Sequence, residues 1–174
     1  MAIKDRLVAD PIIVTATMGA ADFAWADALR RAHFPPERNL LSAHVTLFHH
    51  LPPSAQGEIM ERLSRLCVGP APRAMLADVL HLGRGVAYHI DSPDLMAMRQ
   101  EIAEAFHGML TPQDTAKPRL HVTIQNKVAP DVSRALYQQL RADFTPRPFA
   151  ITGLAAWWYR GGPWEEIRSY RFRG

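Results

Sequence analysis

Residues 44–47 read His-Val-Thr-Leu and residues 121–124 read His-Val-Thr-Ile, so one tetrapeptide recurs with a single conservative change. In an extended strand, alternate side chains point to the same face. Each histidine therefore shares a face with the threonine two positions later, and the aliphatic residues between and after them occupy the other face. The two copies predict two strands that each present an imidazole and a hydroxyl on one face and pack into the core with the other.

The repeat extends beyond the two motifs. A shift of 77 residues, from 44 to 121, also carries the helix start at Gln56 onto Ser133 and the strand at Ala74 onto Ile151. It moves the first strand, at Ile12, onto His89. From periodicity and from turn and capping residues we expect strands over 11–18, 43–50, 74–82, 86–90, 120–127, 149–159 and 165–172, and helices over 19–34, 56–67, 92–109 and 131–142.

This element order predicts an α+β fold. The order strand, helix, His-strand, helix, strand occurs once in residues 10–82 and again in residues 86–172. Neither half buries a core alone, so the halves should pack around a pseudo-twofold axis. We therefore expect a single bilobal domain over 1–174. Its two βαβαβ-type lobes would line a central cleft with mainly antiparallel sheet and carry helices outside.

The composition is that of a globular protein, with 48% hydrophobic and 21% charged residues in 174. The formal net charge of +3 gives weak support for an anionic ligand such as RNA. The single cysteine, Cys67, excludes an internal disulfide framework and is expected to be a buried thiol. No signal-peptide pattern or membrane-length apolar run occurs, so we expect a cytoplasmic protein with no membrane association and no obligate protein partner.

The paired motifs fit phosphodiester chemistry. An unperturbed imidazole has a pKa near ~6.5, so at neutral pH one histidine can be neutral and the other protonated. The neutral ring of the pair His44 and His121 would deprotonate an attacking water, and the protonated ring would give its proton to the departing ribose oxygen. The hydroxyls of Thr46 and Thr123 would bind the non-bridging phosphate oxygens. This chemistry requires no metal and no cofactor.

With these residues the chain resembles the 2H phosphoesterase superfamily, whose signature is two His-hydrophobic-Thr-hydrophobic motifs in a duplicated α+β fold. The stretch Lys117–Thr123 resembles the second motif of its bacterial 2′-5′ RNA ligase-like branch of RNA 2′,3′-cyclic phosphodiesterases. The resemblance implies a metal-independent hydrolase that acts on 2′,3′-cyclic phosphate or 2′-5′ linkages of RNA or nucleotides, with 2′-5′ ligation as the reverse reaction. It also implies catalysis by His44 and His121, and phosphate binding by Thr46 and Thr123. One departure is Leu120, which stands where many members carry proline.

Several further residues have two interpretations. Arg119 lies two before His121, so it either clamps the phosphate from the cleft face or extends into solvent as a strand-edge arginine. Four aromatic residues cluster around the last predicted hairpin, namely Trp157, Trp158, Tyr159 and Trp164. Each of them, like His81 and His89, either contacts the substrate or serves an ordinary packing or hairpin role. His49 and His50 end the first motif strand and are expected at solvent or at the strand edge.

Two other functions compete with the phosphodiesterase. In the first, the histidines bind a metal, but no carboxylate lies at a characteristic spacing and no His-Glu-x-x-His or Cys-x-x-Cys occurs. In the second, the chain is a non-catalytic RNA- or nucleotide-binding protein that uses the same cleft. The expected substrate is an RNA end or a small cyclic nucleotide. The sequence does not distinguish among these substrates, and it does not decide which histidine is the acid.

Overall fold

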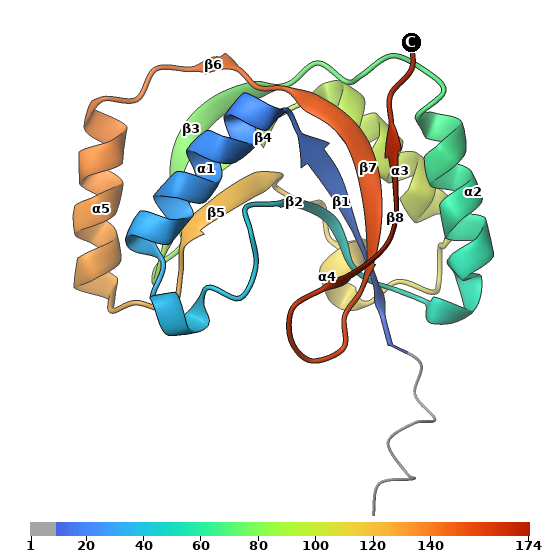
Figure 1. Cartoon of the computed structure of the whole chain (residues 1–174), viewed down its shortest axis with the longest axis horizontal. Coiled ribbons are helices and arrows are strands. Elements are labelled where there is room, and N and C mark those ends of the chain that lie inside the picture. The colour runs from blue at the N-terminus through green and yellow to red at the C-terminus, as the bar shows by residue number, and fades with distance from the viewer. Residues whose placement is uncertain (1–9) are drawn as a thin grey trace, which may run out of the picture.

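The computed structural model describes residues 10–174 (Figure 1). The strands are β1 (Ile12–Met18), β2 (Val45–Leu51), β3 (Met75–His81), β4 (Val86–Asp91), β5 (His121–Gln125), β6 (Arg147–Pro148), β7 (Ile151–Trp158) and β8 (Glu165–Arg171). The helices are α1 (Ala20–His33), α2 (Gln56–Leu66), α3 (Pro93–Ala105), α4 (Pro112–Thr115) and α5 (Pro130–Ala142). Every predicted strand and helix is present, while α4 and β6 were not predicted.

The strands form one curled, antiparallel sheet in the order β6-β3-β4-β5-β2-β1-β7-β8. The order is symmetric about the contact between β2 and β5. Moving outward, β1 and β7 follow β2 on one side, and β4 and β3 follow β5 on the other. The 77-residue shift pairs the same strands, namely β2 with β5, β1 with β4, and β3 with β7. The α+β fold and its pseudo-twofold arrangement are therefore confirmed.

The two sequence halves exchange their last strands. β3 ends the first half yet pairs with β4 of the second, and β7 of the second half pairs with β1 of the first. We call β2, β1, β7 and β8 the His44 half-sheet, and β5, β4, β3 and β6 the His121 half-sheet. Helix α2 packs against β7 and β8, α5 packs against β3, and α1 crosses to contact β5. Each half of the chain thus completes the core of the other.

Local chemistry explains where several elements begin and end. The β3–β4 hairpin turns through Gly83, whose φ of 86° lies in the left-handed region that glycine adopts without steric cost. Ser92 caps the start of helix α3, because its hydroxyl accepts from the Leu95 amide at 3.1 Å, and Pro93 occupies the first helical position. Within residues 10–174, no helix has both the length and the apolar character needed to cross a membrane.

Candidate active site

The two motifs meet at the centre of the sheet. β2 and β5 pair through Val45 and Val122. Continuing this antiparallel register by one residue in each direction sets His44 opposite Thr123 and His121 opposite Thr46. Opposite side chains in a sheet lie about 5 Å apart and diagonal ones about 7–8 Å. The register therefore brings the two histidines into diagonal positions with the two threonines between them.

Along each motif strand, polar and aliphatic side chains alternate between the two faces of the sheet, as the motif predicts. Val45, Leu47, Val122 and Ile124 are at most 1% exposed and belong to the hydrophobic core. The histidines and threonines of both motifs are half-buried on the opposite face. Because the aliphatic side chains anchor each strand, the polar groups are held on a rigid surface.

The polar face opens into a cavity of about 330 Å³, which we call the histidine cavity. All five residues predicted for the site line it, namely His44, Thr46, Arg119, His121 and Thr123. Its other walls come from Leu47, His49, Arg99, Gln113, Asp114, Pro118 and Trp164. Arg119 is exposed and lies just before β5. The structure thus brings both imidazoles to one solvent-accessible space.

Hydrogen bonds fix the tautomer of both rings in the same way. His44 Nδ1 lies 2.8 Å from the carbonyl oxygen of Ser42, and His121 Nδ1 lies 2.6 Å from that of Arg119. A carbonyl oxygen only accepts, so each Nδ1 carries a hydrogen and donates it. Nε2 of each ring is then the atom that gains or loses a proton. Both partners stand two residues before their histidine, which repeats the pseudo-twofold relation at the level of single atoms.

The electrostatic environment of His44 favours its neutral form. Burial lowers the pKa of His44 most, and the nearby charges of Arg30, His121 and His49 lower it further, against the opposing hydrogen bond to Ser42. The resulting pKa is about 4. At neutral pH the Nε2 of His44 is therefore unprotonated.

Two buried arginines hold the motif strands and were not identified from sequence. Arg30 of α1 donates from Nη1 to the Thr123 carbonyl at 3.0 Å, and Arg99 of α3 donates from Nε to the Leu47 carbonyl at 3.2 Å. Each is 4% exposed. Their guanidinium carbons lie 4.3 Å and 4.5 Å from the ring centres of Phe34 and Phe48. Helices from opposite halves of the chain thus fasten the two motif strands.

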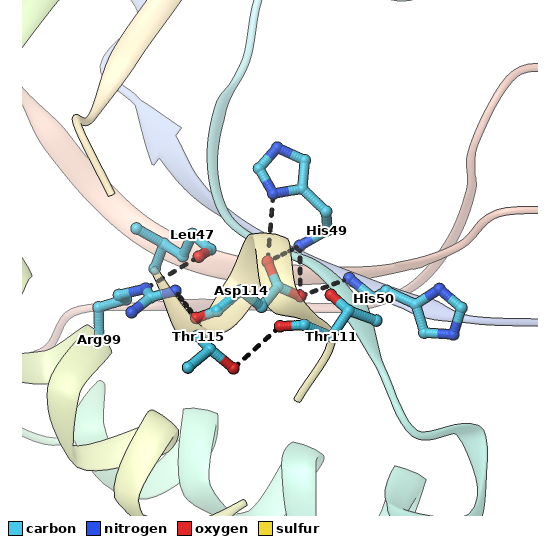
Figure 2. Close-up of polar contacts among 7 residues, drawn as sticks. All are labelled: Leu47, His49, His50, Arg99, Thr111, Asp114 and Thr115. Carbon is cyan, nitrogen blue, oxygen red and sulfur yellow. Dashed lines mark hydrogen bonds and ion pairs between the residues drawn. The ribbon is translucent and has the colours of Figure 1, made fainter. Parts of the chain in front are cut away.

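The helix α4, also unforeseen, carries a buried carboxylate at the cavity wall (Figure 2). Asp114 is 1% exposed and accepts from the backbone amides of His49 and His50 at 2.8–3.1 Å. It also lies 3.2 Å from His49 Nδ1. Burial raises the pKa of Asp114, but the hydrogen bonds from His49 and His50 outweigh burial and bring that pKa below its ordinary value. His49 and His50 are exposed toward the end of β2, as expected, and the ring of His49 also lines the histidine cavity.

The other residues that the sequence leaves with two interpretations mostly lie outside the histidine cavity. Nε2 of His81 is hydrogen-bonded to the hydroxyl of Ser133 on α5, and Tyr159 is 45% exposed. Neither residue lines the histidine cavity. His89 lies beside His121 on β4, but its Nδ1 donates to the Leu120 carbonyl at 3.0 Å and its ring does not line the cavity. Trp157 lines a neighbouring cavity, described below. Trp164, another aromatic of the last hairpin, packs against His44 with ring centres 4.7 Å apart.

The expectation for Cys67 is tested by its burial. Cys67 is 2% exposed, and burial raises the pKa of its thiol, so it is the buried thiol that was predicted. Among residues 10–174, no three His, Cys, Asp or Glu side chains are grouped as a metal site.

Comparison with known proteins identifies a matching family model and solved structures with a similar fold. A family model described as the 2′-5′ RNA ligase superfamily matches residues 19–163. The structure is similar to Escherichia coli LigT complexed with 3′-AMP, at 16% identity over 95% of this chain and 99% of that chain, with a TM-score of 0.64. It is also similar to TT0787 of Thermus thermophilus, at 14% identity over 94% and 98% of the two chains, with a TM-score of 0.61. LigT has also been solved with NADP+, with ATP and with phosphate. No curated protein matches the chain by sequence.

Proposed function

The chain belongs to the 2′-5′ RNA ligase superfamily, and from this we propose that it is a phosphodiesterase for 2′,3′-cyclic phosphate or 2′-5′ linkages of RNA or nucleotides. His44 and His121 act as its general acid/base pair. Thr46, Thr123 and Arg119 bind the phosphate. The nucleotide and phosphate complexes of LigT support a phosphate-containing substrate for a chain of this fold.

The observation that carries the proposal is the pairing of the two imidazoles across one cavity. Each ring has its Nδ1 hydrogen committed to a backbone carbonyl, so each directs its proton chemistry through Nε2. In-line displacement at phosphorus needs a base beside the attacking oxygen and an acid beside the departing one. Two imidazoles at diagonal positions of adjacent strands supply both groups on either side of one phosphate.

Each step uses residues of the cavity. A water oxygen attacks phosphorus and forms the new P–O bond, while Nε2 of His44 takes the water proton. The bond from phosphorus to the ribose 2′ or 3′ oxygen breaks, and that oxygen receives the proton from Nε2 of His121. The hydroxyls of Thr46 and Thr123 donate to the non-bridging oxygens, where charge is redistributed during the displacement. Proton exchange with solvent restores both rings.

The low pKa of His44 and its place in the cavity wall support the role of base for this residue. A ring that is already neutral at pH 7 accepts a proton from water without first losing one, and His121 is then the acid. When a 5′-hydroxyl replaces water as the attacking group, the same pair joins two RNA ends through a 2′-5′ bond. The reverse of that reaction cleaves such a bond with the roles exchanged.

The test is turnover of a nucleoside 2′,3′-cyclic phosphate by the full chain in the presence of EDTA. We expect turnover by the wild type and a loss of about 10²–10⁴-fold in kcat for His44→Ala and for His121→Ala. His50→Ala is the matched control, because His50 follows the same motif but its side chain does not line the cavity. Activity that survives either motif substitution would contradict the paired mechanism. Nucleotide binding without any turnover would indicate a binding protein instead.

A further inference from the structure

A second and larger cavity, of about 580 Å³, adjoins the histidine cavity. The two cavities share His44 and Trp164 as walls. The second cavity lies between the end of β1, the start of α1, residues 40–43 and the β7–β8 hairpin. Its volume is within the ~300–1,000 Å³ typical of small-molecule sites. A ligand anchored by its phosphate beside His44 would therefore extend into it.

The second cavity is built for a neutral, partly apolar group. Met18, Phe23 and Leu40 contribute apolar surface. Phe23 and Leu40 remain 37% and 60% exposed, so their surfaces are available to a ligand. Within the described residues, Arg171 is the only side chain with a permanent charge in its walls. A second phosphate would find one cation there, whereas a flat uncharged ring would find continuous apolar contact.

Aromatic rings form the wall next to the histidine cavity. The ring centre of Trp164 lies 4.7 Å from that of His44 and 6.3 Å from that of Trp157. Trp157 is fixed because its indole Nε1 donates to the hydroxyl of Thr15 at 2.9 Å. Both indoles are half-buried and line the cavity. Rigid aromatic faces beside a phosphate site are suited to stacking a nucleobase.

Polar groups complete the lining at positions suited to a ribose or a base edge. The exposed Thr17 and Ser42 carry hydroxyls into the wall, and Thr152 stands beside Thr17, to whose carbonyl it donates at 3.3 Å. Hydroxyls donate and accept, so they can pair with sugar hydroxyls or with ring nitrogens of different bases.

We propose that the second cavity binds the nucleoside esterified to the scissile phosphate, with its base against the Trp157–Trp164 wall. The proposal rests on the phosphodiesterase function proposed above, and it makes the nucleoside itself a specificity determinant. The enzyme then discriminates strongly between a nucleoside cyclic phosphate and the same sugar phosphate without a base.

The experiment compares adenosine 2′,3′-cyclic phosphate with ribose 2,3-cyclic phosphate. For the wild type we expect kcat/KM to be at least about 10-fold higher for the adenosine substrate. Trp157→Leu, which removes the aromatic face, should reduce that ratio about 10-fold through KM. Trp157→Phe keeps an aromatic ring and should retain most of it. Tyr159→Leu is the control, because Tyr159 is an exposed aromatic of the same hairpin that lines neither cavity.

A further variant and a binding measurement test the subsite independently of the Trp157 variants. Leu40→Ser alters the exposed rim and should lower the same ratio even if the Trp157 variants fold poorly. Binding of adenosine 3′-phosphate and of ribose 3-phosphate, followed by amide NMR shifts, separates the subsite from turnover. Base-dependent shifts at residues 17–19 and 40–42 support the proposal, even if neither cyclic phosphate is hydrolysed. Equal ratios in all variants, or no base-dependent shifts at these residues, overturn it and leave the phosphodiesterase proposal standing on its own test.

Discussion

At the scale of single residues, the backbone two positions before each histidine orients its ring and fixes its tautomer. The carbonyls of Ser42 and Arg119 accept from Nδ1 of His44 and His121, so neither tautomer depends on a side chain that substitution could remove. The local conformation of each motif therefore sets which ring nitrogen is bonded to the backbone and which is left free. Substitutions at 42 and 119 should leave the tautomers intact while changing the cavity wall.

The low pKa of His44 leads to a prediction about pH. Its folded pKa of about 4 lies below the ordinary 6.5, so between these values the unfolded chain binds a proton that the folded chain does not. The contribution of His44 to folding stability should therefore fall as pH drops from about 6.5 to 4 and level off below that range. We expect the His44 ring to titrate below about pH 5 by NMR. The stability loss from pH 7 to pH 5 should be smaller in His44→Gln. Titration of the His44 ring near 6.5 would contradict this assignment.

The motif hydroxyls give a second prediction at this scale. Thr46→Val and Thr123→Val remove a hydroxyl with little change in shape, so each should lower kcat about 10- to 100-fold through weaker binding of the non-bridging oxygens. Thr46→Ser and Thr123→Ser retain the hydroxyl and should recover most of the activity. Steady-state kinetics on a nucleoside 2′,3′-cyclic phosphate checks this. Equal activity of the Val and Ser variants would exclude a role for the hydroxyls.

At the scale of elements, the sequence predicts the strands and helices whose residues follow a repeated or alternating pattern. The motif strands, their buried valines and the hairpin at Gly83 follow from local pattern, so they were located correctly. The partners of Arg30 and Arg99 are carbonyls 93 and 52 residues away, and no local pattern specifies such a contact. Helix α4 has only four residues, and its buried Asp114 is stabilised by amides of a distant strand. Its position depends on tertiary contacts, so periodicity could not reveal it.

The contact between α4 and β2 predicts a stability effect. Asp114→Asn keeps the shape of the side chain but removes the charge and one acceptor, so it should destabilise the fold by about 1–3 kcal/mol at pH 7. The folded pKa of Asp114 is lowered, so its contribution is present above the unfolded value near 3.8 and disappears as pH falls through the folded value. Urea denaturation at pH 7 and at pH 3 measures both effects.

Glu101→Gln, at an exposed position of α3, is the control for Asp114 and should change stability by less than about 0.5 kcal/mol. A variant at Asp114 as stable as the control at pH 7 would show that the buried hydrogen bonds do not hold α4 in place. A destabilisation that stays constant down to pH 3 would contradict the charge-dependent part of the prediction.

At the scale of the whole molecule, strand exchange joins the two halves of the chain. Because β3 and β7 each complete the opposite half-sheet, we propose that the chain unfolds as a single unit. Leu154→Ala in β7 removes a fully buried side chain and should cost about 2–5 kcal/mol. Hydrogen exchange should then accelerate to a similar extent in β1 and in β4. Faster exchange confined to the His44 half-sheet would mean that the lobes unfold separately.

The pattern that the two motifs share also explains which parts of the site could be predicted from the sequence. The 77-residue repeat predicted the symmetry axis, and the cavity at that axis contains all five expected site residues. Trp164 lines both cavities and lies in the loop between β7 and β8, outside the two motifs. The sequence marks it only as one of four aromatics near the last hairpin, and its packing on His44 is what places it at the site.

The central claim is that two imidazoles from opposite halves of the chain act on one phosphate. A crystal structure of the protein with a bound nucleoside 3′-phosphate tests this most directly. We predict that Nε2 of His44 and Nε2 of His121 both lie about 2.6–3.2 Å from oxygens of the same phosphate, with the hydroxyls of Thr46 and Thr123 on its other oxygens. A phosphate that contacts only one of the rings, or that binds outside the histidine cavity, would contradict the account.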